Sequence, residues 1–377
     1  MLLKKHSRPY IFTLSYRIKD RCSNFILLNS LKEIALVLMT FFAGIYNIVF
    51  AQHLPIDKSR FFTDEQLIQI TLAADFKKMD KENLRPDKEP RFFPAAISFL
   101  YPDSSLLSDD VEIRIRGVFR REECVTPPLM INFKAPAAVT FKKLGHLKLV
   151  RPCDVTSYNE QLVLKEYLVY KIYNLVTEKS FRTRLVKITF QNTSGKNRTP
   201  THYAFFIEEM DDVAKRNGCF EIKSPKFQTE QTERKQTTLL ALFQYMIGNT
   251  DWAIPLYRNV KLMRINKDSM SLPFVVPYDF DYCGLVNAAY AIPVPELEIA
   301  NVRQRLYRGF ARTMEELQPA LQILQDKRRA IDSLIVNFEP LSARNKKEMI
   351  NYLDEFYSAI EDEKNIKHLF IDNARRD

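Results

Sequence analysis

Two short acidic segments contain the residues best suited to chemistry. The first holds Asp251 and, eight positions later, Asn259; the second holds Asp279 and Asp281 directly after an apolar run that ends at Pro277. A carboxylate can orient a reacting hydroxyl, while Asn and Asp oxygens suit Mg²⁺ bound to phosphates. Two carboxylates beside an apolar run are costly to bury without a cation. These segments therefore predict phosphoryl-transfer chemistry.

The composition excludes several common kinds of site. The 377-residue chain is 46% hydrophobic, with 27 Phe and 17 Tyr, which is enough for a packed core and not typical of a disordered protein. Its eight glycines form neither a G-x-G-x-x-G fingerprint nor a G-x-x-x-x-G-K-[ST] loop. Half of the formal charge of +10 lies in residues 1–51, and the mild basicity of the remainder does not indicate a nucleic-acid partner.

The elements that must position these acids begin with a β-rich first half. Residues 111–116 alternate between apolar and charged side chains, which is the period of a half-buried strand. Before them, Thr63-Asp64-Glu65 is a helix start signal and predicts a short helix over residues 63–74. The strands expected in this half cover residues 94–101, 111–116, 127–133, 138–141 and 147–150.

The second half is expected to be mainly helical. A change to helical spacing marks a helix over residues 158–176, and strands over 183–190 and 202–207 follow it. The later helices are expected at residues 211–217, 239–247, 297–310, 313–326, 327–336 and 342–361. This order predicts an α+β protein; it suits a fold with two lobes and also any other α+β fold. The predicted parts are an extension over residues 52–94, a β-rich lobe over 95–210 with one helix, and a helical lobe over 211–377 that carries the acids.

The start of the chain resembles a secretory signal. Residues 34–51 are almost entirely apolar and end in Val49-Phe50-Ala51, a small-x-small cleavage pattern that would leave Gln52 as the new N-terminus. Because the preceding 33 residues are long for such a signal, a start downstream of Met1 or an uncleaved membrane anchor are alternatives; a buried core helix is another. We expect export to the periplasm, cell surface or exterior, with membrane contact only through residues 34–51 if they are uncleaved.

Cysteine use agrees with export. Four cysteines follow residue 51, and four cysteines allow three pairings. Cys124 follows one predicted strand and Cys153 follows another, so we expect a Cys124–Cys153 bridge, which leaves Cys219 to pair with Cys283. The alternative is four buried free thiols. The Cys and His residues form no zinc-binding spacing.

The order of these motifs resembles the CotH family of secreted atypical protein kinases, named after a spore-coat protein. The resemblance covers residues 95–310. Its motifs are Arg114-x-Arg116-Gly117, the strand around Lys148, a Glu-bearing helix, residues 204–209, the Asp251/Asn259 segment and Pro277-Tyr278-Asp279-Phe280-Asp281. The last motif matches the family's Pro-Trp-Asp-x-Asp, with Tyr for Trp. The resemblance implies a bilobal protein-kinase-like fold that uses ATP and Mg²⁺ to phosphorylate Ser or Thr of a secreted or surface protein.

The resemblance also implies roles for the acids. Asp251 would be the base-like catalytic acid, Asn259 and Asp279 would be metal ligands, and Asp281 would support Asp279. The eight-residue interval from Asp251 to Asn259 departs from the five residues of the ordinary kinase catalytic loop. Residues 252–257 would be an insertion at that point.

A lysine and a hinge complete the implied nucleotide site. Lys148 would contact the phosphates of ATP, held by an ion pair with Glu166 or, as the alternative, with Glu160. The residues that would meet the adenine base form a hinge between the lobes: Glu208, Glu209 and Met210.

Other interpretations of the same residues exist. An exported binding or surface-assembly protein would keep the fold without catalysis, and a metal-dependent hydrolase would use Asp279 and Asp281 without the usual His-rich metal set. Lys148 and Glu166 would then be ordinary solvent-facing residues, and Asp251 a turn residue. Arg114 and Arg116, which share one strand face, would either bind phosphate or pair with surface acids.

Overall fold

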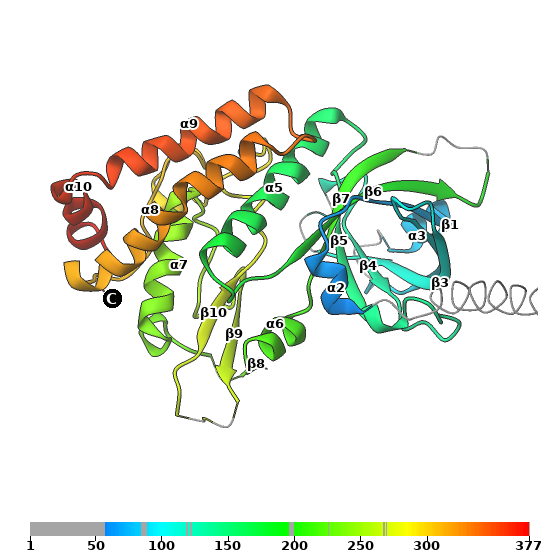
Figure 1. The fold of residues 1–377 in the computed structure, drawn as a ribbon, viewed down its shortest axis with the longest axis horizontal. Helices are drawn as coiled ribbons and strands as arrows, with labels where there is room; N and C mark the ends of the chain where they lie inside the picture. The colour runs from blue at the N-terminus through cyan, green and yellow to red at the C-terminus, as the bar shows by residue number, and fades with distance from the viewer. Residues whose placement is uncertain are drawn as a thin grey trace, which may run out of the picture. The chain divides into compact units, whose positions relative to one another are not determined.

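The computed structural model describes residues 57–376 except 84–88, 118–119, 121–122, 196–199, 225, 267 and 269. These residues belong to one unit, which extends from Ile56 to Asp377. The predicted signal segment, residues 1–51, lies outside the described residues. Strands occupy the first part of the described chain and helices dominate the last part, so the predicted α+β class is confirmed (Figure 1).

Seven strands of the described residues close into a barrel in the order β1-β2-β3-β4-β5-β7-β6. Neighbouring strands are antiparallel except β1 and β6, whose parallel pairing closes the sheet. Alternate side chains fill the interior, because successive residues of a strand point to opposite faces. The strands are β1 Ile68–Ala74, β2 Phe93–Leu100, β3 Leu106–Ile115, β4 Leu129–Asn132, β5 His146–Val150, β6 Thr183–Asn192 and β7 Thr201–Ile207.

Strand β1 contradicts the helix predicted over residues 63–74. Ile68, Ile70 and Leu72 are buried and the residues between them are more exposed, which is the strand period. The start signal at Thr63 instead marks the end of α2 (Lys58–Thr63). Because β1 pairs with β2 and β6, the sheet begins before residue 95, where the boundary of the β-rich lobe was expected.

Helix α5 (Ser157–Val176) connects the barrel to the helical part of the chain. The Thr156 side chain caps its first turn by accepting the N–H of Asn159. The helix packs against β7 on one side and against α8 on the other. Its Lys165 and Glu166 are as buried as its apolar residues, so the helix carries charge into the interior between the two parts. The helix predicted over residues 158–176 is confirmed.

A small antiparallel sheet lies beyond α5, with the strand order β10-β9-β8. Helix α7 packs against β10, and α6 packs against β8. The two acidic segments flank this sheet: one links α7 to β9 and the other follows β10. The elements are α6 Met210–Arg216, β8 Cys219–Ile222, α7 Arg234–Met246, β9 Val260–Ile265 and β10 Phe274–Pro277.

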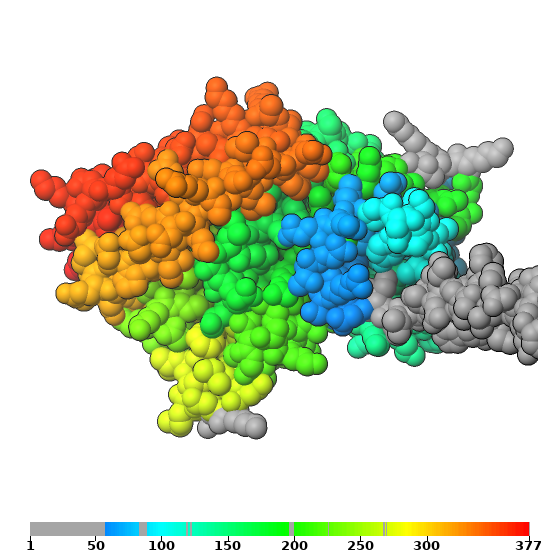
Figure 2. All heavy atoms as spheres, in the orientation of Figure 1, coloured from blue at the N-terminus to red at the C-terminus, as the bar shows by residue number. Residues whose placement is uncertain are grey.

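Three α-helices lie near the end of the described chain, namely α8 (Met314–Val336), α9 (Ala343–Ala359) and α10 (Glu363–Lys367), and a short π-helix, His368–Asp372, follows them. Helices α8 and α9 pack together and form the orange and red surface at the upper left of Figure 2. Helix α8 is one continuous helix, whereas two adjacent helices, 313–326 and 327–336, were predicted. In the described residues, no helix has the length and apolar character needed to span a membrane.

Two further predictions of secondary structure are wrong. Leu297 ends a short 3₁₀ helix at Pro295–Leu297, and residues 298–310 form no helix. Their arginines reach the neighbouring backbone instead, as when Arg308 donates to the main-chain oxygen of Thr250 and Arg305 to that of Tyr352. Residues 138–141 form no strand and lead into a 3₁₀ turn at Lys142–Leu144.

The cysteines follow the predictions in part. Cys124 and Cys153 form a disulfide, as expected from the strands they follow. Cys219 and Cys283 are buried free thiols, so their predicted pairing is wrong. That pairing rested on elimination alone, with no evidence that the two residues lie close together.

Candidate active site

The loop after α7 holds Asp251 and Asn259 against each other. The Asn259 side-chain amide donates to the main-chain oxygen and to the Oδ2 atom of Asp251, each at 2.8 Å. Arg258 forms an ion pair with Asp251 Oδ1 at 2.5 Å. Between them, Ala253 and Arg258 exchange two backbone hydrogen bonds of 3.0 Å. The eight-residue interval is therefore a closed loop that returns Asn259 to Asp251.

Asn259 also joins the first segment to the second. Its main-chain oxygen accepts the N–H of Tyr278 at 3.0 Å, because β9 begins directly after Asn259 and pairs with β10. Asn259 and Asp279 have φ values of 52° and 64°, a left-handed conformation that Asn and Asp adopt more readily than most residues. The N–H of Asp279 donates to the hydroxyl of Tyr170 on α5 at 2.8 Å.

Glu166, also on α5, faces the second acidic segment. Arg120 lies between Glu166 and Asp281: Nη1 is 3.9 Å from Glu166 Oε2, and Nε is 3.8 Å from Asp281 Oδ2. The hydroxyl of Tyr290 donates to the same Asp281 oxygen at 3.0 Å. Within the described residues, neither Glu166 Oε1 nor Arg120 Nε has a hydrogen-bond partner. Two buried carboxylates thus share one guanidinium, which leaves negative charge for a proton or cation to balance.

Burial and mutual repulsion raise the pKa values of these acids. Burial, and then the charges of Asp281 and Asp279, raise the pKa of Glu166 well above its ordinary value. Burial and the charge of Asp279 raise the pKa of Asp281 to about 6, although Arg120 opposes this. Burial also raises the pKa of Asp251, against the opposite effect of Arg258. The charge of Asp279 contributes to all three shifts, so the structure brings these acids together in one site.

Lys148 lies beside the same site. Its neighbours in β5, Leu147 and Leu149, are fully buried, whereas Lys148 points out of the barrel with Nζ 5.0 Å from the ring centre of Tyr278. Burial lowers the pKa of Lys148 to about 8, while the charge of Asp279 raises it. Lys148 therefore faces the second acidic segment, and its contact with phosphates stays a prediction.

The predicted ion pair between Lys148 and Glu166 is not formed. In the described part of the chain, the cation that reaches Glu166 is Arg120. The alternative acid, Glu160, is turned toward the barrel, where its carboxylate accepts the N–H of Tyr203 at 2.8 Å. Glu160 therefore has no place in this site.

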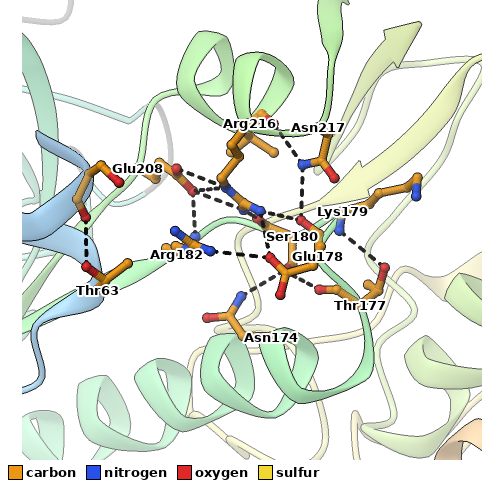
Figure 3. A network of polar contacts seen from close by, with 12 residues as sticks. Thr63, Asn174, Thr177, Glu178, Lys179, Ser180, Arg182, Glu208, Arg216 and Asn217 are labelled. Carbon is orange, nitrogen blue, oxygen red and sulfur yellow. Dashed lines mark hydrogen bonds and ion pairs between the residues drawn. The ribbon is translucent and has the colours of Figure 1, made fainter. Parts of the chain in front are cut away.

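The hinge residue Glu208 has a structural role. Its carboxylate forms an ion pair of 3.1 Å with Arg216 and accepts the N–H of Arg182, whose main-chain oxygen in turn accepts the N–H of Glu208. Arg216 also donates to the main-chain oxygens of Glu178 and Ser180. Figure 3 shows how this network joins the segment after α5 to α6. The backbone N–H of Glu208 is thus already used within the protein, and any contact of this residue with adenine stays a prediction.

The other two hinge residues begin α6. The Glu209 carboxylate forms an ion pair with Lys58, and Met210 is buried in the core. Their side chains are therefore occupied, and their part in binding adenine stays a prediction that would involve their backbone groups alone.

Three residues of the site were missed from the sequence: Arg120, Tyr170 and Tyr290. Tyr170 could have been found, because it lies one helical turn after Glu166 and so shares its face of α5. Arg120 comes three positions after Gly117 in the R-x-R-G motif, but nothing in its spacing indicates contact with α5. Tyr290 follows the second acidic segment in a loop without a periodic pattern.

The donors at this site fit Mg²⁺ bound to phosphates better than a metal held by protein alone. In the ranges the structure describes, no three His, Cys, Asp or Glu side chains converge to hold a metal. Mg²⁺ commonly takes one or two carboxylates and completes its shell with phosphate oxygens and water. Asp279 and the side-chain oxygen of Asn259 would supply the protein ligands, and the uncompensated charge around Asp281 suits a divalent cation.

No family model matches the sequence, and no curated protein matches it. A solved structure, the Helicobacter pylori proinflammatory kinase CtkA, aligns with a TM-score of 0.34 and 14% sequence identity over 62% of this chain and 87% of that chain. Such a low score carries no argument about activity, and membership of the CotH family stays a prediction.

Proposed function

We propose that this protein is an exported phosphotransferase that moves a phosphoryl group from Mg·ATP to a Ser or Thr hydroxyl of a secreted or surface protein. The observation that carries the proposal is the chain of contacts from Asp251 through Asn259 to Tyr278 and Asp279. These contacts join two loops that are separate in the sequence, which supports a proton acceptor at Asp251 and metal ligands at Asn259 and Asp279.

Each side chain has a role that follows from its surroundings. Asp251 would orient the acceptor hydroxyl and take its proton, a task that its raised pKa favours. Asn259 and Asp279 would hold Mg²⁺, which neutralises phosphate charge when bound. Lys148 would contact the phosphates as a point charge. Glu166 would act on the site through Arg120, which it shares with Asp281.

The experiment is phosphoryl transfer from γ-labelled ATP with Mg²⁺, scored as autophosphorylation and as labelling of a generic protein substrate. We expect Asp279→Asn to abolish transfer without unfolding the protein, because Asn is nearly isosteric and tolerates the left-handed backbone of residue 279. Asp326→Asn, at an exposed position of α8, is the matched control. Undiminished transfer by Asp279→Asn would contradict the metal role.

A binding measurement separates this proposal from its alternative, an inactive exported binding or surface-assembly protein. The alternative has one observation in its favour, namely that Arg120 and not Lys148 pairs with Glu166. Mg·ATP at one hundred times its dissociation constant should stabilise the enzyme by about 2.7 kcal/mol. No change in melting temperature with millimolar Mg·ATP would reject the nucleotide site, whereas stabilisation without transfer would favour the inactive protein.

A further inference from the structure

A cavity lies in the barrel part of the molecule, and none of the acids of the candidate active site lines it. Its volume is about 310 Å³, within the range of small-molecule sites. Its walls come from α3 (Phe76–Asn83), the loop after Cys124, the residues that follow β5, and the adjoining ends of β6 and β7. None of the residues assigned to the candidate active site lines it.

Arg151 is the buried charge of this cavity. Its side chain has only 6% of its surface exposed, and its Nε atom donates to the main-chain oxygen of Pro127 at 2.7 Å. The guanidinium carbon lies 4.8 Å from the ring centre of Phe190. Burial lowers the pKa of Arg151 to about 10, and the charge of Asp80 opposes that shift without forming an ion pair. In the described residues, no hydrogen bond or ion pair engages its two terminal nitrogens.

Such a guanidinium is preorganised to bind an anion. A buried cation is costly unless it is paired and hydrogen-bonded, and two unused terminal nitrogens match the two oxygens of a carboxylate or phosphate. Lys77, exposed on α3, adds positive charge at the rim. With Arg151 and Lys77 against Asp80, the cavity favours a negative ligand.

The remaining walls suit a flat apolar body. Phe76 and Phe190 pack edge to face with ring centres 5.9 Å apart. His202 lines the cavity as well, and in the described structure its Nε2 atom is buried without a hydrogen-bond partner. The disulfide fixes two further walls, since the N–H of Thr126 donates to the main-chain oxygen of Cys153 at 2.9 Å.

We propose that this cavity binds a small molecule with one carboxylate or phosphate group on an aromatic or apolar body. The oxyanion lies against the terminal nitrogens of Arg151, the body lies against Phe76 and Phe190, and His202 exchanges a hydrogen bond with a polar group of the ligand. None of the residues that line this cavity is assigned to the proposed nucleotide site.

Phenyl phosphate and benzoate are suitable probes, with benzyl alcohol as the uncharged control. Binding is measured by calorimetry and by the ring proton signals of His202. We expect both anions to bind more tightly than benzyl alcohol and to shift the His202 signals. Arg151→Lys keeps the positive charge but loses the planar guanidinium that can donate two parallel hydrogen bonds. It should therefore weaken binding about tenfold, the equivalent of 1.4 kcal/mol.

Two tryptophan variants test the cavity independently of Arg151→Lys, in case that variant does not fold. Val155 is 57% exposed and lines the cavity, whereas Val139 is 78% exposed and does not. Val155→Trp should block the probes and Val139→Trp should not. Asp279→Asn should still bind them, which separates this site from the nucleotide site. Equal binding by wild type and Val155→Trp, or no shift of the His202 signals at millimolar probe, would overturn the proposal.

Discussion

Arg120 changes the roles expected for the charged residues of the site. In the sequence-based prediction, Glu166 fixes the long stem of Lys148. In the structure, Arg120 contacts Glu166 and Asp281 together, and Lys148 lies against Tyr278 without using either acid. With a pKa of about 8, Lys148 is mostly protonated at neutral pH, and a bound phosphate would raise that pKa further. Lys148 therefore keeps its charge for a ligand.

The pKa of Asp281 makes a prediction about stability. Its value in the folded protein, about 6, exceeds the ordinary 3.8, so between about pH 4 and 6 the folded state binds a proton that the unfolded chain has released. The free energy of unfolding therefore falls as pH rises through this interval. Asp281→Asn removes that loss and should stabilise the ligand-free protein near pH 7 by roughly 1 to 3 kcal/mol.

Urea unfolding at several pH values checks this expectation. The oxygen of the new Asn side chain can still accept the Tyr290 hydroxyl, so the local contacts are preserved. Asp326→Asn, exposed on α8, should keep the pH dependence of the wild type. If the free energy of unfolding of Asp281→Asn follows the wild-type pH dependence as closely as that of the control does, the pKa of Asp281 is not raised in the folded protein.

At the scale of elements, the two acidic segments depend on each other through a pair of glycines. The N–H of Gly284 donates to the main-chain oxygen of Gly248 at 3.0 Å, and the N–H of Leu285 donates to that of Ile247 at 3.0 Å. Helix α9 closes this junction, because a Cβ atom on either glycine would collide with the hydroxyl of Tyr352. Helix α9 therefore packs directly against the backbone that joins the two acidic segments.

A matched pair of substitutions tests this junction. Gly218 and Gly248 have φ values of 65° and 67°, so alanine at either position costs about 1 to 2 kcal/mol of backbone strain. A Cβ atom at Gly218 would meet nothing within 4 Å, whereas one at Gly248 would meet Tyr352. Gly248→Ala should therefore cost about 1 to 3 kcal/mol more in denaturant unfolding and also lower phosphoryl transfer. Equal losses of stability in the two variants would show that Tyr352 does not pack tightly against Gly248.

At the scale of the whole molecule, local patterns predicted elements and failed where distant segments meet. The strand period of β3 reported its burial correctly, and the acids of both segments stood out beside apolar strands. The helical period located α5, but it did not report that this helix is buried on nearly all sides, Lys165 and Glu166 included. Strand β1 was misread because a helix start signal precedes it by a few residues. Arg120 was missed because its contact with α5 exists only after the barrel and the helices have packed together. Closure of the barrel through β1 and β6 is likewise a long-range pairing.

The cysteines allow a test of export that uses the entire chain. With Cys124 and Cys153 bridged and Cys219 and Cys283 free, the denatured and unreduced protein should expose two thiols if the chain begins at Gln52. It should expose three if Cys22 is retained, and five if the protein matures in a reducing compartment. Thiol titration in denaturant reports the disulfide state, and the mass of the native protein reports the N-terminus. We expect two thiols and an N-terminus at Gln52, because export supplies both the cleavage and the oxidising conditions. Five thiols on a full-length chain would contradict export, while a count of three with the bridge intact would favour an uncleaved anchor over residues 34–51.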